Sequence, residues 1–337
     1  MTTTLVFVVA FCIVAVLVYM ARYSGRVRIA ELRLIDAPID AVWTQVADFA
    51  HWDSWNPWLV HASAAHSTLS ARTDGVASSY AWNSPRGGEG VLQHRRLTQH
   101  RAIEQSIRLK QPFAVRGRSR WKFVARGNQT EVSWEVRGRV NFSMRAFAQT
   151  VNGALTLDCR YGLDRLAQLL ESPNAPRYAL SFVGVLDVAP CRYVYRTYQG
   201  PIKGVSDAAR RILAELQQQL SQRGIEPTGA PIAVYVETSI KLRTTKCHIG
   251  LPIGSADAGA LPVREMVAHR AFQVRLQGSY SALEIAWYQA IQRMTLDAIR
   301  PDQRIAPFER YVVVAKTRNA NDGVTELHIP VARPPPG

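Results

Sequence analysis

The sequence "APIDAVWTQVADFAHWDSWNPW", residues 37–58, decides the fold of the first half of this 337-residue chain. Pro38 stands where a helix begins, because its fixed φ suits the first helical turn. Val42, Val46 and Phe49 follow at helical spacing, which is typical of one apolar face packed on a core. The stretch therefore predicts a helix that ends shortly before a tryptophan-rich segment.

That segment, "HWDSWNPW" at residues 51–58, contains Trp52, Trp55 and Trp58, three of the eight tryptophans of the chain. Two interpretations are open. The rings can fill a core, since aromatic side chains contribute much of the packing energy of protein interiors. They can also line a cavity that holds a ligand, in which case at least one ring contacts that ligand.

The surrounding sequence predicts a sheet that curls around a long helix. Alternating residues at 25–35 indicate a strand before the first helix, and half-buried antiparallel strands typically alternate in this way. A closing helix with an apolar leucine stripe is expected at about residues 142–170. Between the two helices, alternation and turn residues predict strands at roughly 77–83, 90–99, 101–110, 116–126 and 130–139.

Four stretches follow one another in the first half of the chain: "APIDAVWTQVADFAHWDSWNPW", "SSYAWNSPRGGEGVLQ", "IRLKQPFAVRGRSRWKFVARGNQTEVSW" and "DCRYGLDRLAQLLE". On these stretches, residues 25–171 resemble the polyketide-cyclase/START-like superfamily, which has the helix-grip fold. The resemblance implies a deep apolar cavity between sheet and closing helix, with Trp52, Trp55, Trp58 and Trp82 as candidate ligand contacts. It does not choose among lipid carriers, hormone receptors and cyclases, because one fold hosts many functions.

The second half of the chain contains an internal repeat. "YRTYQGPIKGVSDAARRILAELQQQL" is followed by "APIAVYVET" and "KCHIGLPI", and "VRLQGSYSALEIAWYQAIQRMTLDAI" is followed by "APFERYVVV" and "ELHIPVA". Each copy predicts a strand, a glycine turn, an amphipathic helix and two strands. Because two copies are too few for a solenoid, we expect one pseudo-symmetric domain with a groove where the copies meet.

Residues 180–332 resemble the GyrI-like, or bacterial effector-binding, domain of multidrug-sensing regulators. The stretches "VAPCRYVYRTYQG", "HRAFQVRLQGSYSAL" and "PFERYVVV" carry the resemblance. The DNA-binding helices of those regulators have no counterpart here, which puts a direct role in transcription in doubt. The domains are thus predicted at 25–171 and 180–332, with a linker at 172–179 and a disordered tail at 333–337.

The repeat singles out one acidic residue. Aligning "PIAVY" (231–235) with "PFERY" (307–311) pairs Ala233 with Glu309. In the resembling family, a glutamate of this motif faces the pocket and receives cationic, aromatic ligands. The resemblance therefore implies that Glu309 is the anionic partner and that Tyr311 flanks it, with Tyr280 and Trp287 as wall residues. The alternative is that Glu309 is an exposed strand residue paired with an arginine.

The N-terminal residues predict a membrane anchor. Residues 4–21 are 18 uncharged, mostly apolar positions, close to the minimum for crossing the hydrocarbon core of a bilayer. Arg22, Arg26 and Arg28 follow, and the positive-inside rule places such residues on the cytoplasmic side. We therefore expect a single-pass protein of the cytoplasmic membrane, with residues 1–24 as the anchor and both domains facing the cytoplasm.

The charge and the cysteines exclude some partners. The formal net charge is +15, which can indicate an anionic partner. The arginines are nevertheless spread along the chain, and neither a helix-turn-helix nor zinc-finger spacing is present, so we expect no direct nucleic-acid partner. The four cysteines form no CxxC pair, so no metal site and no cofactor are expected. No sequence feature identifies a protein partner.

The sequence therefore predicts an α+β protein that binds or senses small hydrophobic or amphipathic molecules, cationic ones among them, through two cavity domains. Catalysis is not expected, but one alternative is an enzyme, hydrolase-like or cyclase-like, in which Glu309 is a general base toward a hydrophobic substrate. Another alternative is a ligand-gated interaction module that does not bind DNA.

Overall fold

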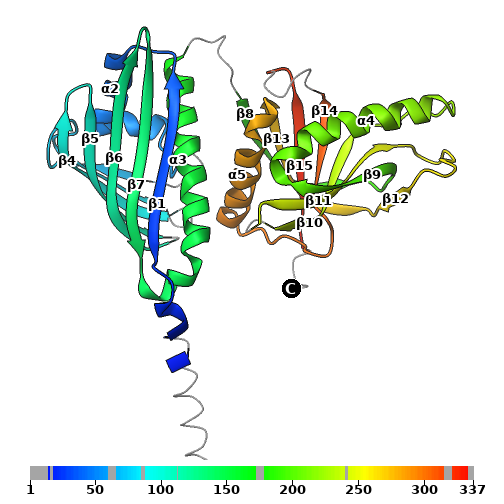
Figure 1. Ribbon diagram of the computed structural model, residues 1–337, viewed down its shortest axis with the longest axis horizontal. Coiled ribbons are helices and arrows are strands. Elements are labelled where there is room, and N and C mark those ends of the chain that lie inside the picture. Colours follow the sequence, from blue (N-terminus) through cyan, green and yellow to red (C-terminus); the bar gives the residue numbers. More distant parts are fainter. Residues whose placement is uncertain are drawn as a thin grey trace, which may run out of the picture. The chain divides into compact units, whose positions relative to one another are not determined.

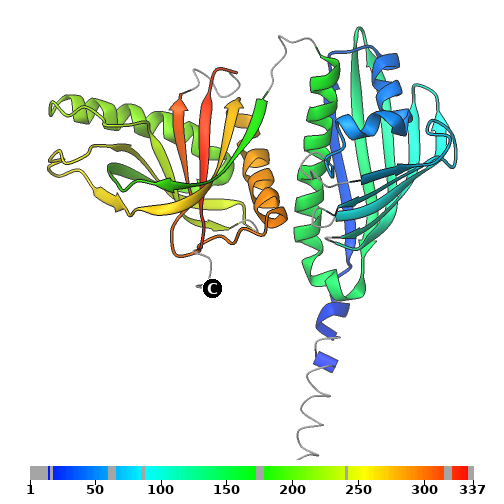
Figure 2. The same ribbon diagram turned by 180° about the vertical axis from the view of Figure 1, so that it is seen from behind.

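The computed structural model describes residues 14–15, 18–59, 66–84, 88–111, 113–171, 178–239, 242–314 and 321–332. The chain divides into two compact units, Met1–Ala175 and Pro176–Gly337, and each is described by itself. The two units are coloured from blue to green and from green to red in Figures 1 and 2.

Unit 1 is a seven-stranded antiparallel sheet with helices on one of its faces (Figure 1). The strand order is β1-β7-β6-β5-β4-β3-β2. Its elements are β1 (Arg26–Ile35), α2 (Ile39–Ala47), η1 (Phe49–Ser54), β2 (His66–Leu69), β3 (Ser79–Ser84), β4 (Gly88–Thr98), β5 (Ala102–Gln111), β6 (Val115–Arg126), β7 (Gln129–Val140), η2 (Phe142–Phe147) and α3 (Ala148–Leu170).

The predicted sheet and closing helix are confirmed, with two differences. A short 3-10 helix, η2, occupies the first residues of the predicted closing helix, so α3 begins only at Ala148. Strand β2 was not predicted, because four mostly polar residues carry no clear alternation. Helix α3 packs against the inner face of the sheet through a stripe of buried residues that includes Val151, Leu155 and Leu163.

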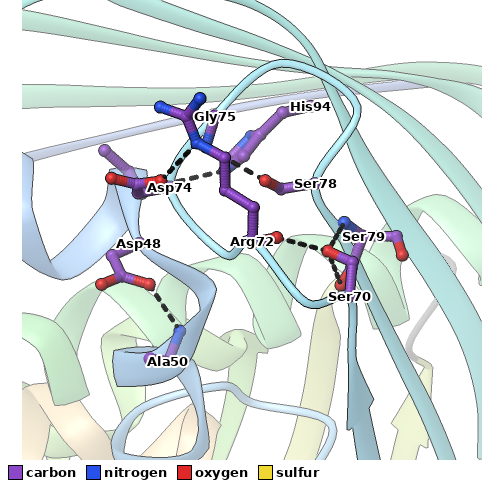
Figure 3. A network of polar contacts seen from close by, with 10 residues as sticks. Asp48, Ala50, Ser70, Arg72, Asp74, Gly75, Ser78, Ser79 and His94 are labelled. Atoms are coloured by element: carbon purple, nitrogen blue, oxygen red, sulfur yellow. Dashed lines mark hydrogen bonds and ion pairs between the residues drawn. The ribbon is translucent and has the colours of Figure 1, made fainter.

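The loop between β2 and β3 closes one edge of unit 1 (Figure 3). The Ser79 amide donates to Ser70 Oγ at 2.8 Å, and Arg72 donates to Asp74 at 2.8 Å. The Phe49 amide donates to the Thr73 carbonyl at 3.1 Å. The loop is therefore fastened to the start of η1 and holds the tryptophan segment in place.

Unit 2 consists of two halves with the same element order, and this confirms the predicted repeat. Each half reads strand, strand, helix, strand, strand. The first half is β8 (Tyr178–Val188), β9 (Cys191–Pro201), η3 (Ile202–Gly204), α4 (Val205–Ser221), β10 (Ile232–Ser239) and β11 (Thr244–Pro252). The second is β12 (Val263–Met266), β13 (His269–Gly278), η4 (Tyr280–Ala282), α5 (Leu283–Leu296), β14 (Phe308–Val313) and β15 (Val324–Pro330).

The halves share one antiparallel sheet in the order β12-β9-β11-β10-β14-β15-β13-β8. The order is symmetric about the β10–β14 pair, and each outermost strand belongs to the opposite half. Helices α4 and α5 cover two separate hydrophobic cores on the sheet, one under each helix. The two copies meet at the paired strands β10 and β14, where the sequence predicts a groove.

The membrane prediction is corrected. Most of residues 4–21 lies outside the described residues. In the ranges that the structure describes, no helix has both the length and the apolar character needed to cross a bilayer. The single-pass localisation in the cytoplasmic membrane is therefore contradicted. The predicted tail at 333–337 and residues 172–177 of the linker also lie outside the described residues.

Candidate functional site

Glu309 lies at the centre of the unit 2 sheet. It pairs in register with Ala233, its counterpart in the other half of the repeat. The side chain is 1% exposed. Two of its neighbours, Tyr235 and Tyr311, pack with the core under α4, whereas Trp287 packs with the core under α5. The carboxylate is therefore enclosed where the two cores meet.

Three neutral groups donate hydrogen bonds to this carboxylate. Trp287 Nε1 donates to Oε1 at 2.6 Å, and Tyr235 OH donates to the same oxygen at 2.8 Å. Tyr311 OH donates to Oε2 at 2.8 Å. In the described parts of the chain, no lysine, arginine or histidine forms an ion pair with Glu309.

Burial decides the electrostatics of the cluster. It raises the pKa of Glu309, and the three hydrogen bonds, which favour the charged form, only partly offset it. Burial also raises the pKa of Tyr235 and of Tyr311 well above the ordinary value, and the neighbouring Glu309 charge adds to the rise. Both tyrosines are therefore neutral donors.

Aromatic rings surround the carboxylate. The Tyr280 and Tyr311 rings meet edge to face at 5.8 Å, and the Tyr235 and Trp287 rings do so at 5.6 Å. The thiol of Cys247 is buried on the same face, and burial together with Glu309 raises its pKa to about 12. The thiol is thus protonated and is not a nucleophile here.

The structure brings together the four residues predicted for this site, which are Glu309, Tyr311, Tyr280 and Trp287. Tyr311 and Trp287 contact the carboxylate, and Tyr280 packs against Tyr311. Tyr235 was missed, although it occupies the same place in "PIAVY" as Tyr311 does in "PFERY". Comparing the aligned tyrosines as well as the aligned Ala233 and Glu309 would have found it.

The alternative interpretation of Glu309, an exposed residue paired with an arginine, is wrong. The neighbouring Arg310 points to the opposite face of the sheet, where it pairs with Glu326 at 3.6 Å. Side chains that follow one another in a strand point to opposite faces. The arginine next to Glu309 in sequence therefore cannot neutralise it.

This arrangement allows two kinds of chemistry. A buried carboxylate without a cationic partner attracts a cation more strongly than an exposed one, because water screens it less. A carboxyl with a raised pKa can also accept or donate a proton near neutral pH. Within the described ranges, no group of three or more His, Cys, Asp or Glu side chains is arranged to hold a metal ion.

The tryptophans of unit 1 form a second cluster. Trp52 and Trp55 are fully buried, with ring centroids 4.6 Å apart. Trp121 and Trp134 stack at 4.2 Å, and the Trp55 ring lies edge-on to both. Most indole N–H groups have acceptors, but Trp55 Nε1 is buried and has no hydrogen-bond partner.

Trp58 differs from these because it is only partly buried. Its ring stacks on that of Trp82 with centroids 4.9 Å apart and planes 2° from parallel, and its Nε1 donates to Asp158 at 3.1 Å. Gly90 makes room for this pair, since a Cβ there would lie 2.2 Å from the Trp82 ring. Of the four candidate tryptophans, Trp58 is the one that is not closed off from solvent.

One comparison with known protein families matches unit 1. Residues 26–171 match a family model described as polyketide cyclase / dehydrase and lipid transport. A search of curated proteins finds no match.

Solved structures show distant similarities. Protein CV1439 from Chromobacterium violaceum is 14% identical over 43% of this chain and 97% of its own, with a TM-score of 0.35. The EcmrR C-terminal domain is 14% identical over 47% of this chain and 99% of its own, with a TM-score of 0.38. XoxI from Bacillus cereus is 18% identical over 43% of this chain and 95% of its own, with a TM-score of 0.34.

The family match begins at the first residue of β1 and ends directly after α3. It therefore covers the whole sheet and the closing helix of unit 1. Residues 26–171 form a polyketide-cyclase-like domain.

Proposed function

We propose that this chain binds small hydrophobic molecules and that unit 2 binds cationic, aromatic ones at Glu309. The observation that carries the proposal is the enclosed carboxylate, 1% exposed and held by three neutral donors. No cation of the described chain neutralises it. A ligand that carries a positive charge and a flat apolar body complements both the charge and the rings around it.

The energetics support a cation as ligand. Burying an ionised carboxylate is costly unless it is paired, and the raised pKa of Glu309 is the sign of that cost. A cation placed beside it would offset the cost, and the faces of Tyr280, Tyr235 and Trp287 would add cation–π attraction of about 0.5–2 kcal/mol. The resemblance of residues 180–332 to GyrI-like effector-binding domains agrees with this proposal.

Unit 1 supports the broader part of the proposal. Its family is described as including lipid transport, and its interior is unusually rich in tryptophan. The partly exposed Trp58, stacked on Trp82, would be the first ring of the cluster to contact a ligand that enters. Trp52 and Trp55 would line the deeper part of such a site.

Replacing Glu309 tests the proposal. Glu309→Gln keeps the shape of the side chain and removes its charge, so it should weaken binding of a cationic aromatic dye by roughly tenfold or more, about 1.4 kcal/mol. Binding of an uncharged dye of the same shape should change much less. Fluorescence titration measures both affinities.

Glu265→Gln is the matched control. Glu265 is an exposed residue of β12 in the same unit, so its replacement removes the same charge away from the site. If the cationic dye binds equally to the wild type and to Glu309→Gln, the proposal fails. If both variants lose the same affinity, the effect is one of overall charge and the proposal also fails.

A second candidate function is hydrolysis of a hydrophobic electrophile, with Glu309 as general base. The uneven hydrogen bonding favours it: Oε1 accepts two hydrogen bonds and Oε2 only one. Oε2 therefore retains capacity to accept a proton from water. Loss of an epoxide or activated ester in the presence of wild type, but not of Glu309→Gln, would establish hydrolysis in place of simple binding.

A further inference from the structure

The strand register of unit 1 places four arginines side by side across the sheet. In one register row near the start of β1, each residue lies directly opposite the next on the neighbouring strand. This row consists of Arg26 on β1, Arg139 on β7, Arg116 on β6 and Arg108 on β5. All four side chains are exposed, on the face of the sheet that α3 does not cover.

A second row of arginines runs beside the first. Two residues further along each strand, Arg28, Arg137 and Arg118 are again directly opposite one another, and all three are exposed. We call these seven residues, Arg26, Arg28, Arg108, Arg116, Arg118, Arg137 and Arg139, the arginine strip. The strip is about 14 Å long and about 7 Å wide, from the spacing of strands and of residues within them.

Six of the seven arginines have no side-chain partner within the described ranges. Only Arg137 forms an ion pair, with Glu135 at 3.1 Å. In the next register row, by contrast, positive and negative side chains alternate across the sheet. This row consists of Glu135, Arg120, Glu104 and Arg96. Arg120 and Glu104 pair there at 3.6 Å. The like charges of the strip are therefore not a simple consequence of a basic composition.

The strip costs stability. Like charges directly opposite one another on neighbouring strands are destabilising, and here they are opposite in two consecutive rows. Between the rows, Gly117 faces Gly138. A Cβ on Gly117 would lie 2.1 Å from the Arg137 carbonyl oxygen, so β6 and β7 approach closely at this point. The repulsion is therefore held between strands whose backbones lie close together.

We propose that the arginine strip binds the phosphodiester backbone of nucleic acid without reading its sequence. A partner with closely spaced negative charges offsets the repulsion among the seven arginines. Double-stranded DNA carries about one charge per 1.7 Å of its axis, so a segment as long as the strip supplies about eight phosphates. The planar guanidinium suits this partner, since it contacts phosphate oxygens through two parallel hydrogen bonds.

The composition of the strip favours contact with a phosphodiester backbone over stacking on bases or insertion into a bilayer interface. Every side chain of its two rows on β1, β7 and β6 is an arginine, with no aromatic ring on which a base could stack and no apolar residue to enter a bilayer interface. This proposal reverses the sequence-based expectation of no direct nucleic-acid partner. The strand register brings together arginines that are far apart in the sequence, and this register could not be read from the sequence.

The test compares two triple variants of the full chain that remove the same charge. Arg116→Gln, Arg118→Gln and Arg139→Gln together disrupt the strip. Arg264→Gln, Arg275→Gln and Arg300→Gln together remove three exposed arginines of unit 2. Anisotropy of a short labelled DNA duplex, titrated between about 0.05 and 0.2 M salt, measures affinity and its salt dependence.

We expect the strip variant to bind the duplex at least tenfold more weakly, and the slope of log affinity against log salt to fall by about 2–3, because each lost phosphate contact removes about 0.9. The unit 2 variant should retain most of the wild-type affinity for the duplex and most of its salt dependence. Equal losses in the two variants would overturn the proposal, because they would indicate attraction by net charge alone.

Vesicles supply the second arm of the experiment. Sedimentation with vesicles containing phosphatidylglycerol, against vesicles of phosphatidylcholine alone, distinguishes a lipid surface from nucleic acid. If the strip variant loses vesicle binding while duplex binding is unchanged, the partner is an anionic bilayer and the proposal is wrong. Circular dichroism of both variants verifies that the sheet is intact.

Discussion

Glu309 shows how one residue can break the symmetry of a duplicated fold. Its counterpart Ala233 lies opposite it in the sheet, and the counterpart of Trp287 in α4 is Ala209 when the two repeats are aligned. The carboxylate and its strongest donor are thus both present in one half and both absent from the other. A pair of changes in one copy is enough to turn an apolar junction into a polar site.

The pH dependence of cation binding follows from the pKa of Glu309. Burial raises this pKa above its ordinary value, so the carboxyl of the free protein takes up a proton while exposed carboxyls are still charged. A cationic dye should bind more strongly when the Glu309 carboxyl is charged than when it is protonated. The affinity for a cationic dye should therefore fall as pH decreases through the raised pKa and reach a plateau above it.

The stability of the fold also depends on the pKa of Glu309, but it should change with pH in the direction opposite to the dye affinity. A raised pKa in the folded state means that stability from the protonated carboxyl is present at low pH and is lost as pH rises through the folded value. Glu309→Gln should remove this loss, so its melting temperature at neutral pH should equal or exceed that of the wild type. A clearly lower melting temperature, with dye binding independent of pH in the wild type, would contradict both expectations.

At the scale of elements, His94 joins β4 to the helical segment of unit 1. Its Nε2 contacts the Ala47 carbonyl at the end of α2 at 2.9 Å, and its ring stacks on Phe49 of η1 at 4.0 Å. Burial is the main cause that lowers the pKa of His94 to about 4. The residue therefore remains neutral at pH values at which a histidine of the unfolded chain is charged.

This lowered pKa predicts acid sensitivity. Between pH 6.5 and about 4 the unfolded chain binds a proton that the folded chain does not, so stability falls as pH decreases, by up to about 3 kcal/mol. Urea unfolding at pH 7 and at pH 5 should show a clear loss for the wild type and a smaller loss for His94→Gln. Identical pH dependence in the two proteins would show that His94 is not the cause, and would direct attention to the buried His328.

The elements were largely predictable from the sequence, whereas the contacts between them were not. Periodicity located both long helices of unit 2, and the repeat predicted its symmetric order. The four mostly polar residues of β2 gave no such signal. Glu309 was predicted because an alignment of the repeats pairs it with Ala233, and Tyr311 was predicted from the resemblance of its motif to GyrI-like domains. The convergence of Tyr235 and Trp287 on one carboxylate oxygen depends on register and rotamers. The arginine strip was missed for the same reason.

At the scale of the molecule, the two units have separate hydrophobic cores. Among the residues that the structure describes, one hydrophobic cluster is built from unit 1 and three are built from unit 2. The enclosed carboxylate and all three of its donors belong to unit 2. The arginine strip and the tryptophan cluster belong to unit 1. Each candidate site therefore depends on the fold of one unit only.

This separation predicts that unit 2 is sufficient for cation binding. A fragment of residues 178–332 should bind a cationic aromatic dye with nearly the affinity of the full chain, since distant, independent sites usually agree within about 0.5 kcal/mol, roughly twofold. Glu309→Gln should cause the same loss in the fragment as in the full chain. Circular dichroism and thermal unfolding establish first that the fragment is folded. A folded fragment that fails to bind the dye, beside a full chain that binds it, would contradict the prediction that unit 2 is sufficient.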